Sequence, residues 1–174
     1  MSVKSAEICA MSALLNCYVL IRSLVNIIEI VEISKIIRKV YLEYKDDLDI
    51  PHFFSFPENC CEGASLFLGY YLFLRFPDNK FEMIRGLHES AYDHVYHLWL
   101  EVDGNIFDLT IDQFPEYENP IFNSQQPHPM SDTFIEDKRL ELIIYLDYYF
   151  NKVVESERFI KSFCRFSELV KINT

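Results

Sequence analysis

HLWLEVDGNIFDLT, residues 97–110, predicts two short β-strands joined by a tight turn at 103–104. Asp-Gly between alternating apolar residues is the strongest short-range signal for a β-hairpin. With this turn, Trp99 lies opposite Asp108 on the neighbouring strand. Because side chains alternate along a strand, His97 and Asp108 project from the same face as diagonal neighbours. An imidazole held by a carboxylate is the orienting half of a nucleophilic catalytic triad, so a nucleophile is expected elsewhere in the chain.

Two adjacent cysteines, Cys60 and Cys61, stand at the start of a predicted helix that runs to about Phe76. At a helix start, free backbone N–H groups and the helix dipole stabilise a thiolate, and the same groups can bind an oxyanion. Small residues follow Cys61 at helical spacing and would let that face approach a sheet closely, namely Ala64, Ser65 and Gly69. Bulkier residues follow Cys60. We therefore assign the nucleophile to Cys61, with Cys60 as the alternative.

Two further residues compete for roles beside this pair. His94 is a rival base, but it has the parity of Leu98 and would face away from Asp108 if the strand extends that far. Asn59 is a candidate oxyanion donor together with the backbone N–H of Cys61. Asn is also a favoured N-cap residue, and we prefer the capping role for Asn59.

Trp99 and Glu101 share the face of the hairpin that carries the expected pair. Trp99 is a candidate wall of a substrate pocket, and plain packing or solvent contact is the equal alternative. Glu101 could hold a loop in place, although plain packing or contact with solvent is the interpretation we favour. Glu116 and Glu118, in a proline-rich stretch, could contact a substrate, and the sequence does not decide this.

The composition narrows the class of protein. The chain has 174 residues, half of them apolar, and a net charge of −11, which disfavours nucleic acid and anionic membranes as partners. No phosphate-binding glycine-rich loop and no metal-ligand spacing is present, so no cofactor or metal is expected. The apolar run 8–21 is too short to span a bilayer. Cysteines 9, 17, 60, 61 and 164 show no disulfide spacing, which indicates reduced thiols and a cytoplasmic location.

The order of predicted elements indicates a single α+β domain over residues 1–174. In it, a Cys-bearing helix packs on a small antiparallel β-meander, flanked by N-terminal and C-terminal helices. The N-terminal helical region covers 5–45, and an irregular link covers 46–60. A strand is predicted at 80–87 and a long loop at 115–132. Thr133 to Glu136 fits a capping box that would open a helix to about Val154, and an amphipathic helix then carries Phe159, Phe163, Phe166 and Val170.

The three segments NCCEGAS, HLWLEVDG and FDLT, in that order within residues 58–114, resemble the papain-like superfamily and most closely its small transglutaminase-like branch. In that branch a Cys opens a helix, a His begins a strand in an H-x-W-x-E context, and an Asp lies on the next strand. Cys61, His97 and Asp108 fall on these triad positions. DLTIDQF also resembles the stretch that follows the acid in small members. The glycine that usually precedes the nucleophile is absent here.

The resemblance implies a papain-like core and attack on an amide carbonyl through a thioester. Members are peptidases, glutamine deamidases, transglutaminases and acyltransferases, and several small bacterial members are toxins or effectors delivered into other cells. We therefore expect a thiol-dependent hydrolase or acyl transferase that acts on a protein or peptide. The alternative is a non-catalytic protein-binding module, or pseudoenzyme, that retains the fold.

Overall fold

The computed structural model describes residues 3–88, 95–152 and 154–174, with side chains from Arg22 onward except Ser23. The chain divides into two compact units, Met1–Glu32 and Ile33–Thr174. Helix α1, Val3–Tyr44, crosses this division, and the described backbone of the first unit is entirely α-helical. Within the described ranges, none of the helices combines the length and the apolar character that a membrane span requires.

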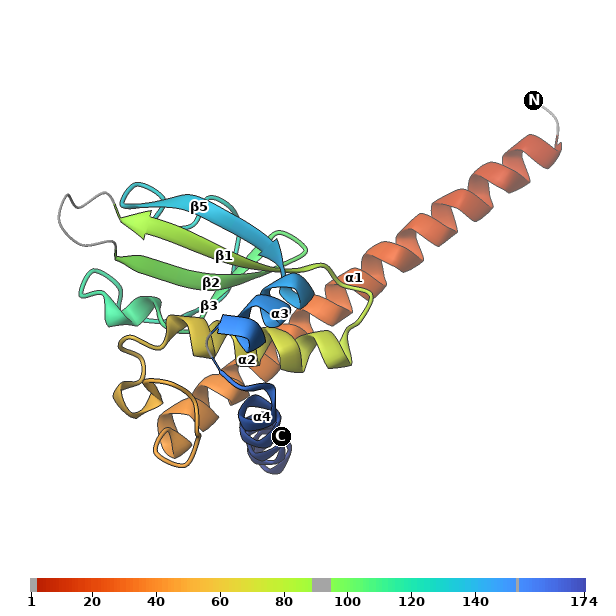
Figure 1. The fold of residues 1–174 in the computed structure, drawn as a ribbon. Coiled ribbons are helices and arrows are strands. Elements are labelled where there is room, and N and C mark those ends of the chain that lie inside the picture. The colour runs from red at the N-terminus through yellow and green to blue at the C-terminus, as the bar shows by residue number, and fades with distance from the viewer. Residues whose placement is uncertain (1–2, 89–94, 153) are drawn as a thin grey trace. The chain divides into compact units, whose positions relative to one another are not determined.

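The second unit has a mixed α+β fold, as predicted (Figure 1). Its described residues form one five-stranded sheet, two short 3-10 turns and three further α-helices after the end of α1. In chain order these are η1 Phe53–Ser55, α2 Cys61–Arg75, β1 Phe81–His88, β2 Tyr96–Val102, β3 Asn105–Asp108, η2 Ile111–Gln113, β4 Ile121–Ser124, β5 Phe134–Glu141, α3 Leu142–Lys152 and α4 Ser156–Asn173.

The sheet is antiparallel throughout, in the order β4-β3-β2-β1-β5. Its centre is the predicted meander β1-β2-β3, and the hairpin has the predicted register, with Val102 opposite Asn105. Asp103 and Gly104 both have positive φ angles, 49° and 78°. Two positive φ values are what a two-residue hairpin turn needs to follow the twist of its strands.

The predicted helix from Thr133 to Val154 is wrong in its first half. Phe134–Glu141 forms strand β5 beside β1, and α3 begins only at Leu142. The capping-box pattern is a local signal, and here long-range pairing overrides it: Arg85 of β1 binds Asp137 at 2.6 Å. The predicted loop 115–132 also contains a strand, β4. The sheet therefore has two more strands than the sequence indicated.

Helix α2 packs closely on the face of the sheet that carries Leu98 and Leu100. A Cβ atom at Gly69 would lie 2.9 Å from a methyl group of Leu100 and 3.0 Å from one of Leu142, so any larger residue there would push these leucine side chains aside. One turn after the start of α2, Ser65 Oγ donates a hydrogen bond to the carbonyl of Leu98 at 3.2 Å. The small residues of this helix thus bring it against β2, next to His97.

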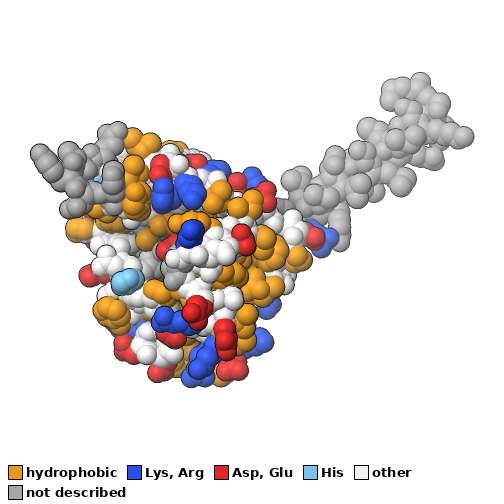
Figure 2. All heavy atoms as spheres, in the orientation of Figure 1, with side chains coloured by type: hydrophobic (Ala, Val, Ile, Leu, Met, Phe, Trp, Pro, Cys, Tyr) orange, Lys and Arg blue, Asp and Glu red, His pale blue; other side chains and the backbone are white. Residues whose placement is uncertain are grey.

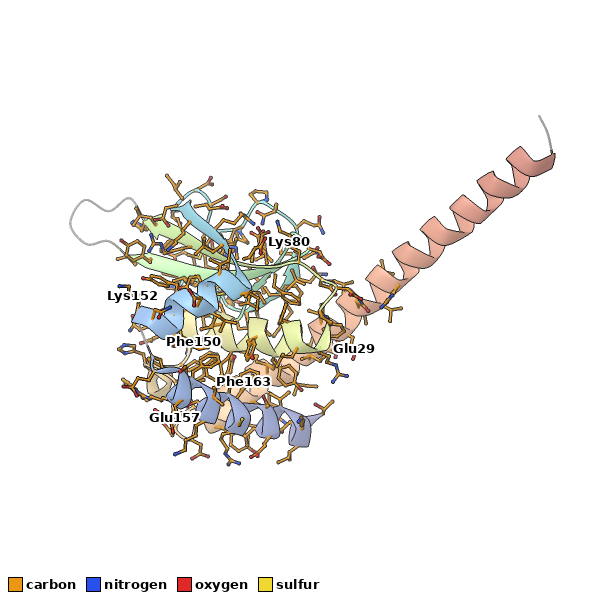
Figure 3. The ribbon with its side chains drawn as sticks, turned by 45° about the vertical axis from the view of Figure 1, so that its right-hand side comes forward. Glu29, Lys80, Phe150, Lys152, Glu157 and Phe163 are labelled. Carbon is orange, nitrogen blue, oxygen red and sulfur yellow. The ribbon has the colours of Figure 1, made fainter. Side chains whose placement is uncertain are left out.

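Aromatic side chains fix α2 from its other side. The ring of Phe67 lies 4.8 Å from that of Phe159, 5.8 Å from Phe163 and 5.5 Å from Phe166, measured between centroids. Figure 3 shows Phe163 pointing from α4 toward α2. Tyr41 of α1 stacks on Phe166. The predicted apolar face of the last helix is confirmed, because Phe159, Phe163, Phe166 and Val170 are all buried.

Candidate active site

His97 and Asp108 form a buried hydrogen-bonded pair at one end of the hairpin. The distance from His97 Nε2 to Asp108 Oδ2 is 2.6 Å, and both side chains are 0% exposed. The pairing follows from strand alternation, because both residues project from the sheet face opposite α2. The carboxylate accepts the Nε2 proton, which leaves the Nδ1 edge of the imidazole available for another partner.

Asp108 accepts hydrogen bonds from three further groups. Thr110 contributes its backbone N–H at 3.0 Å and its hydroxyl at 3.2 Å, both to Oδ1. His128 Nε2 lies 3.3 Å from Oδ2. Burial alone would raise the pKa of Asp108, but the charge of His97 and hydrogen bonds from His128 and His97 hold it well below its usual range. Asp108 is therefore a fixed anion.

The imidazole of His97 responds to this anion and to Cys61. Burial alone would lower the pKa of His97, but the charge and hydrogen bond of Asp108, followed by a hydrogen bond and the charge of Cys61, raise it to about 10. Gln113 Nε2 lies 3.4 Å from Nδ1, and a donor there favours the neutral ring. A full charge at 2.6 Å outweighs one long neutral contact, so the imidazolium is the favoured form.

The two cysteines differ sharply in their surroundings. Cys61 is the first residue of α2 and is partly exposed. Cys60 is 2% exposed, and its thiol donates to the carbonyl of Pro57 at 3.3 Å. Burial and the charge of Cys61 raise the pKa of the Cys60 thiol to about 12, which keeps it protonated and unreactive. Of the two, Cys61 is the thiol that can serve as a nucleophile.

Asn59 does not cap α2, which corrects our preferred interpretation. The N-cap residue is Cys60, without a side-chain cap, and Asn59 is exposed with a φ angle of 58°. The backbone N–H of Asn59 donates instead to Gln113 Oε1 at 3.3 Å. The role of the Asn59 side chain as an oxyanion donor stays a prediction.

Gln113 is held in one orientation close to the pair. Its Nε2 donates to the carbonyl of Thr110 at 2.9 Å, while its Oε1 accepts the Asn59 N–H. These two backbone partners fix which end of the amide faces His97. Gln113 thus links the turn before α2 to the imidazole, and sequence reasoning had assigned it no role.

Trp99 is a core residue, so of the alternatives left open by the sequence the structure shows plain packing rather than a pocket wall. It is 3% exposed and packs with Ile84 and Ile106. The ring of His128, from the proline-rich segment, stacks on the indole with centroids 4.1 Å apart. The proline-rich segment therefore shields the Trp99 indole from solvent.

Glu101 holds neighbouring segments in place, and our preference for plain packing or solvent contact was wrong. The residue is 2% exposed. Arg139 of β5 binds it at 2.7 Å, and Gln126 of the proline-rich segment donates a hydrogen bond to it. A buried carboxylate needs such partners, so Glu101 ties both segments to the central strand β2.

His97, Asp108 and His128 form a compact cluster that could surround a metal ion. One ligand atom from each lies within 4.8 Å of the others. However, His128 Nδ1 accepts the backbone N–H of Met130 at 3.2 Å, so Nε2 carries the proton that faces Asp108. A metal ion on Nε2 would require His128 to lose that proton while Nδ1 remains occupied. The hydrogen bonding therefore fits a structural support for Asp108 better than a metal centre.

Besides Gln113, two further supports of the site escaped the sequence reasoning. His128 stands between Pro127 and Pro129, which restrict the backbone on both sides, and this was its only local signal. Arg38 interrupts the apolar stripe of α1. It is 7% exposed, donates to the carbonyl of Leu109 and binds Asp112 at 2.6 Å. A charge within an apolar stripe indicates a buried partner.

Three candidate residues from the sequence are not part of the cluster around His97. His94 lies outside the described residues. Glu118 is exposed. Glu116 is also exposed and lines a cavity beside Phe114.

The raised pKa of His97 predicts how stability varies above neutral pH. The unfolded ring titrates near 6.5 and the folded ring near 10, so the folded state binds the proton more tightly. The stabilisation from charged His97 is complete below about pH 6.5 and is lost as pH rises toward 10. We expect the difference in unfolding free energy between wild-type protein and His97→Gln to shrink between pH 6 and 9.5 in urea titrations. A difference that stays constant over that range would contradict a charged His97.

Comparison with known protein families, with curated proteins and with solved structures finds no match for this chain.

Proposed function

We propose that this protein is a thiol-dependent hydrolase or acyl transferase that attacks an amide of a protein or peptide. Cys61 is the nucleophile, His97 the base and Asp108 the group that orients the imidazole. The observation that carries the proposal is the buried His97–Asp108 pair, in which Asp108 binds Nε2 at 2.6 Å and leaves the Nδ1 edge of the imidazole for a nucleophile. The pKa of His97 also responds to Cys61, the first residue of α2. The resemblance of residues 58–114 to a papain-like, transglutaminase-like core supports the same assignment.

The proposed chemistry moves one proton back and forth across His97. Because His97 already holds its proton as the favoured imidazolium, Cys61 attacks the amide carbon as the thiolate of that ion pair and forms the C–S bond. The imidazolium then protonates the departing nitrogen as the C–N bond breaks, leaving a thioester on Cys61. Water or an amine attacks the thioester, gives its proton to His97 and releases the thiolate. The buried anion Asp108 stabilises the imidazolium formed in both halves.

The nature of the amide is the finer part of the proposal. The branch that the chain resembles often acts on glutamine side chains, and we favour a glutamine-directed or peptide hydrolase. Members of that branch include secreted toxins and effectors, so delivery into a target cell is compatible with this function.

A non-catalytic binding module is the second candidate, and the burial of the pair favours it. His97 and Asp108 are both 0% exposed. A satisfied buried pair can serve packing alone, and a module that only binds protein would keep the hairpin for that reason.

Alkylation of the thiols separates the two candidates. With iodoacetamide at pH 7, we expect Cys61 to be modified about tenfold faster than Cys164, because a helix start and a neighbouring imidazolium both make a cysteine more reactive. Cys164 is exposed and serves as the internal reference, while buried Cys60 should remain unmodified. Peptide mapping by mass spectrometry over time gives the three rates. Modification of Cys61 at or below the rate of Cys164 would favour the binding module.

A further inference from the structure

A cavity of about 350 Å³ lies one aromatic ring away from His97. Its walls include Phe114, Tyr117, Met130 and Phe134. Two of these rings also pack against the imidazole of His97, with centroids 5.1 Å away for Phe114 and 5.9 Å for Phe134. A concave, mainly apolar pocket beside a perturbed titratable residue is where a ligand is expected.

The chain around this cavity is acidic. Residues 111–137 contain no Lys or Arg and carry six carboxylates. Three of them are paired with arginines from other segments, namely Asp112 with Arg38, Glu136 with Arg139 and Asp137 with Arg85. Glu116, Glu118 and Asp132 supply the remaining negative charge. Glu116 lines the cavity itself. Burial, followed by the charges of Glu116 and Asp132, raises the pKa of Tyr117. The aromatic walls therefore stand in a negative field, which disfavours an anionic ligand.

We propose that this cavity binds a basic side chain, arginine or lysine, of the protein substrate, close to the amide that Cys61 attacks. Aromatic faces accept the apolar stem and the cation of such a side chain, and Glu116 supplies the opposite charge at the rim. The net charge of −11 adds long-range attraction for a basic partner. This assignment of substrate class rests on the proposed function.

Methyl NMR of the methionines tests the cavity without relying on catalysis. Met130 lines the cavity, whereas Met83 is buried in β1 and serves as the reference. Titration with N-acetyl-arginine amide should shift the Met130 methyl signal and leave that of Met83 in place. N-acetyl-norleucine amide, which has no charge, should bind at least threefold more weakly.

Charge-removing variants assign the effect to the cavity. Glu116→Gln should weaken binding of the arginine probe about threefold and leave the norleucine probe unchanged. Glu157→Gln removes a charge of the same sign from an exposed position of α4 (Figure 3). It should change the binding of neither the arginine probe nor the norleucine probe. Equal binding of the two probes, an unshifted Met130 or an unaffected Glu116→Gln variant would overturn the proposal. Arginine-selective binding without fast alkylation of Cys61 would keep the basic ligand and overturn only the catalytic function.

Discussion

If the proposed function holds, replacing Cys61 with alanine is expected to lower the rate of product formation by at least about 10³-fold, because Cys61 is the proposed nucleophile. Cys60→Ala should keep most of the activity, since the pKa of the Cys60 thiol is raised to about 12. Intact-mass spectrometry of candidate protein substrates measures both. A gain of about 1 Da indicates deamidation, fragments indicate proteolysis, and an added amine indicates transfer, each being one fate of the same acyl-enzyme.

The Cys60→Ala variant is the matched control for Cys61→Ala. Both remove one thiol from the start of α2, so a general disturbance of that helix would lower both activities. Thermal unfolding of the two variants checks that each is folded at the assay temperature. If Cys60→Ala removed the activity and Cys61→Ala did not, the nucleophile would be misplaced by one residue.

The central part of the fold was predictable because its signals are local. The Asp-Gly turn sets the hairpin register, and that register places His97 and Asp108 together although they are 11 residues apart. The stop before Pro77 and the small residues of α2 act in the same way. Where neighbours in the chain are also neighbours in space, pattern and propensity are enough.

The errors arose where the partner lies far along the chain. The first half of the predicted helix is in fact strand β5. Its partner strand β1 lies far back in the chain, and the paired residues Arg85 and Asp137 are 52 positions apart. The charges of β5 suit an exposed edge strand, which the capping-box pattern does not reveal. Glu101 was expected in plain packing or solvent contact because Arg139 reaches it across 38 residues.

Part of the support of the site comes from the irregular residues 126–130, which follow β4. The proline-rich stretch supplies His128 to Asp108 and Gln126 to Glu101, and it covers Trp99. Such a segment has no period from which to read which side chains face inward, so no pattern could assign these contacts. In Figure 2 the visible face mixes hydrophobic, acidic and basic side chains, and it likewise carries no simple signature.

Asp108→Asn is expected to lower the unfolding free energy by about 3–5 kcal/mol, although the two side chains have the same shape. The carboxylate receives two imidazole N–H groups on Oδ2 and two groups of Thr110 on Oδ1. An amide has donors at one end, so in either orientation it sets a donor against a backbone N–H or an imidazole N–H. If the NH2 end of the asparagine faces His97, it donates to Nε2 and the ring proton moves to Nδ1. This tautomer of His97 cannot accept a proton from Cys61. Activity should then fall by about 10² or more. Urea unfolding and the mass-spectrometric assay measure the two losses.

The control for this variant is the same substitution in an exposed ion pair. Asp137→Asn in β5 should cost less than about 1 kcal/mol, because the Asp137–Arg85 pair is solvated. The pH dependence isolates the contribution of the buried charge. The pKa of Asp108 is depressed, so its stabilisation is present above the unfolded value near 3.8 and is lost as pH falls below it. The stability gap between wild-type protein and Asp108→Asn should therefore narrow from pH 6 to pH 3. A gap of equal size at both pH values would mean that packing, not the anion held between His97 and His128, accounts for the loss.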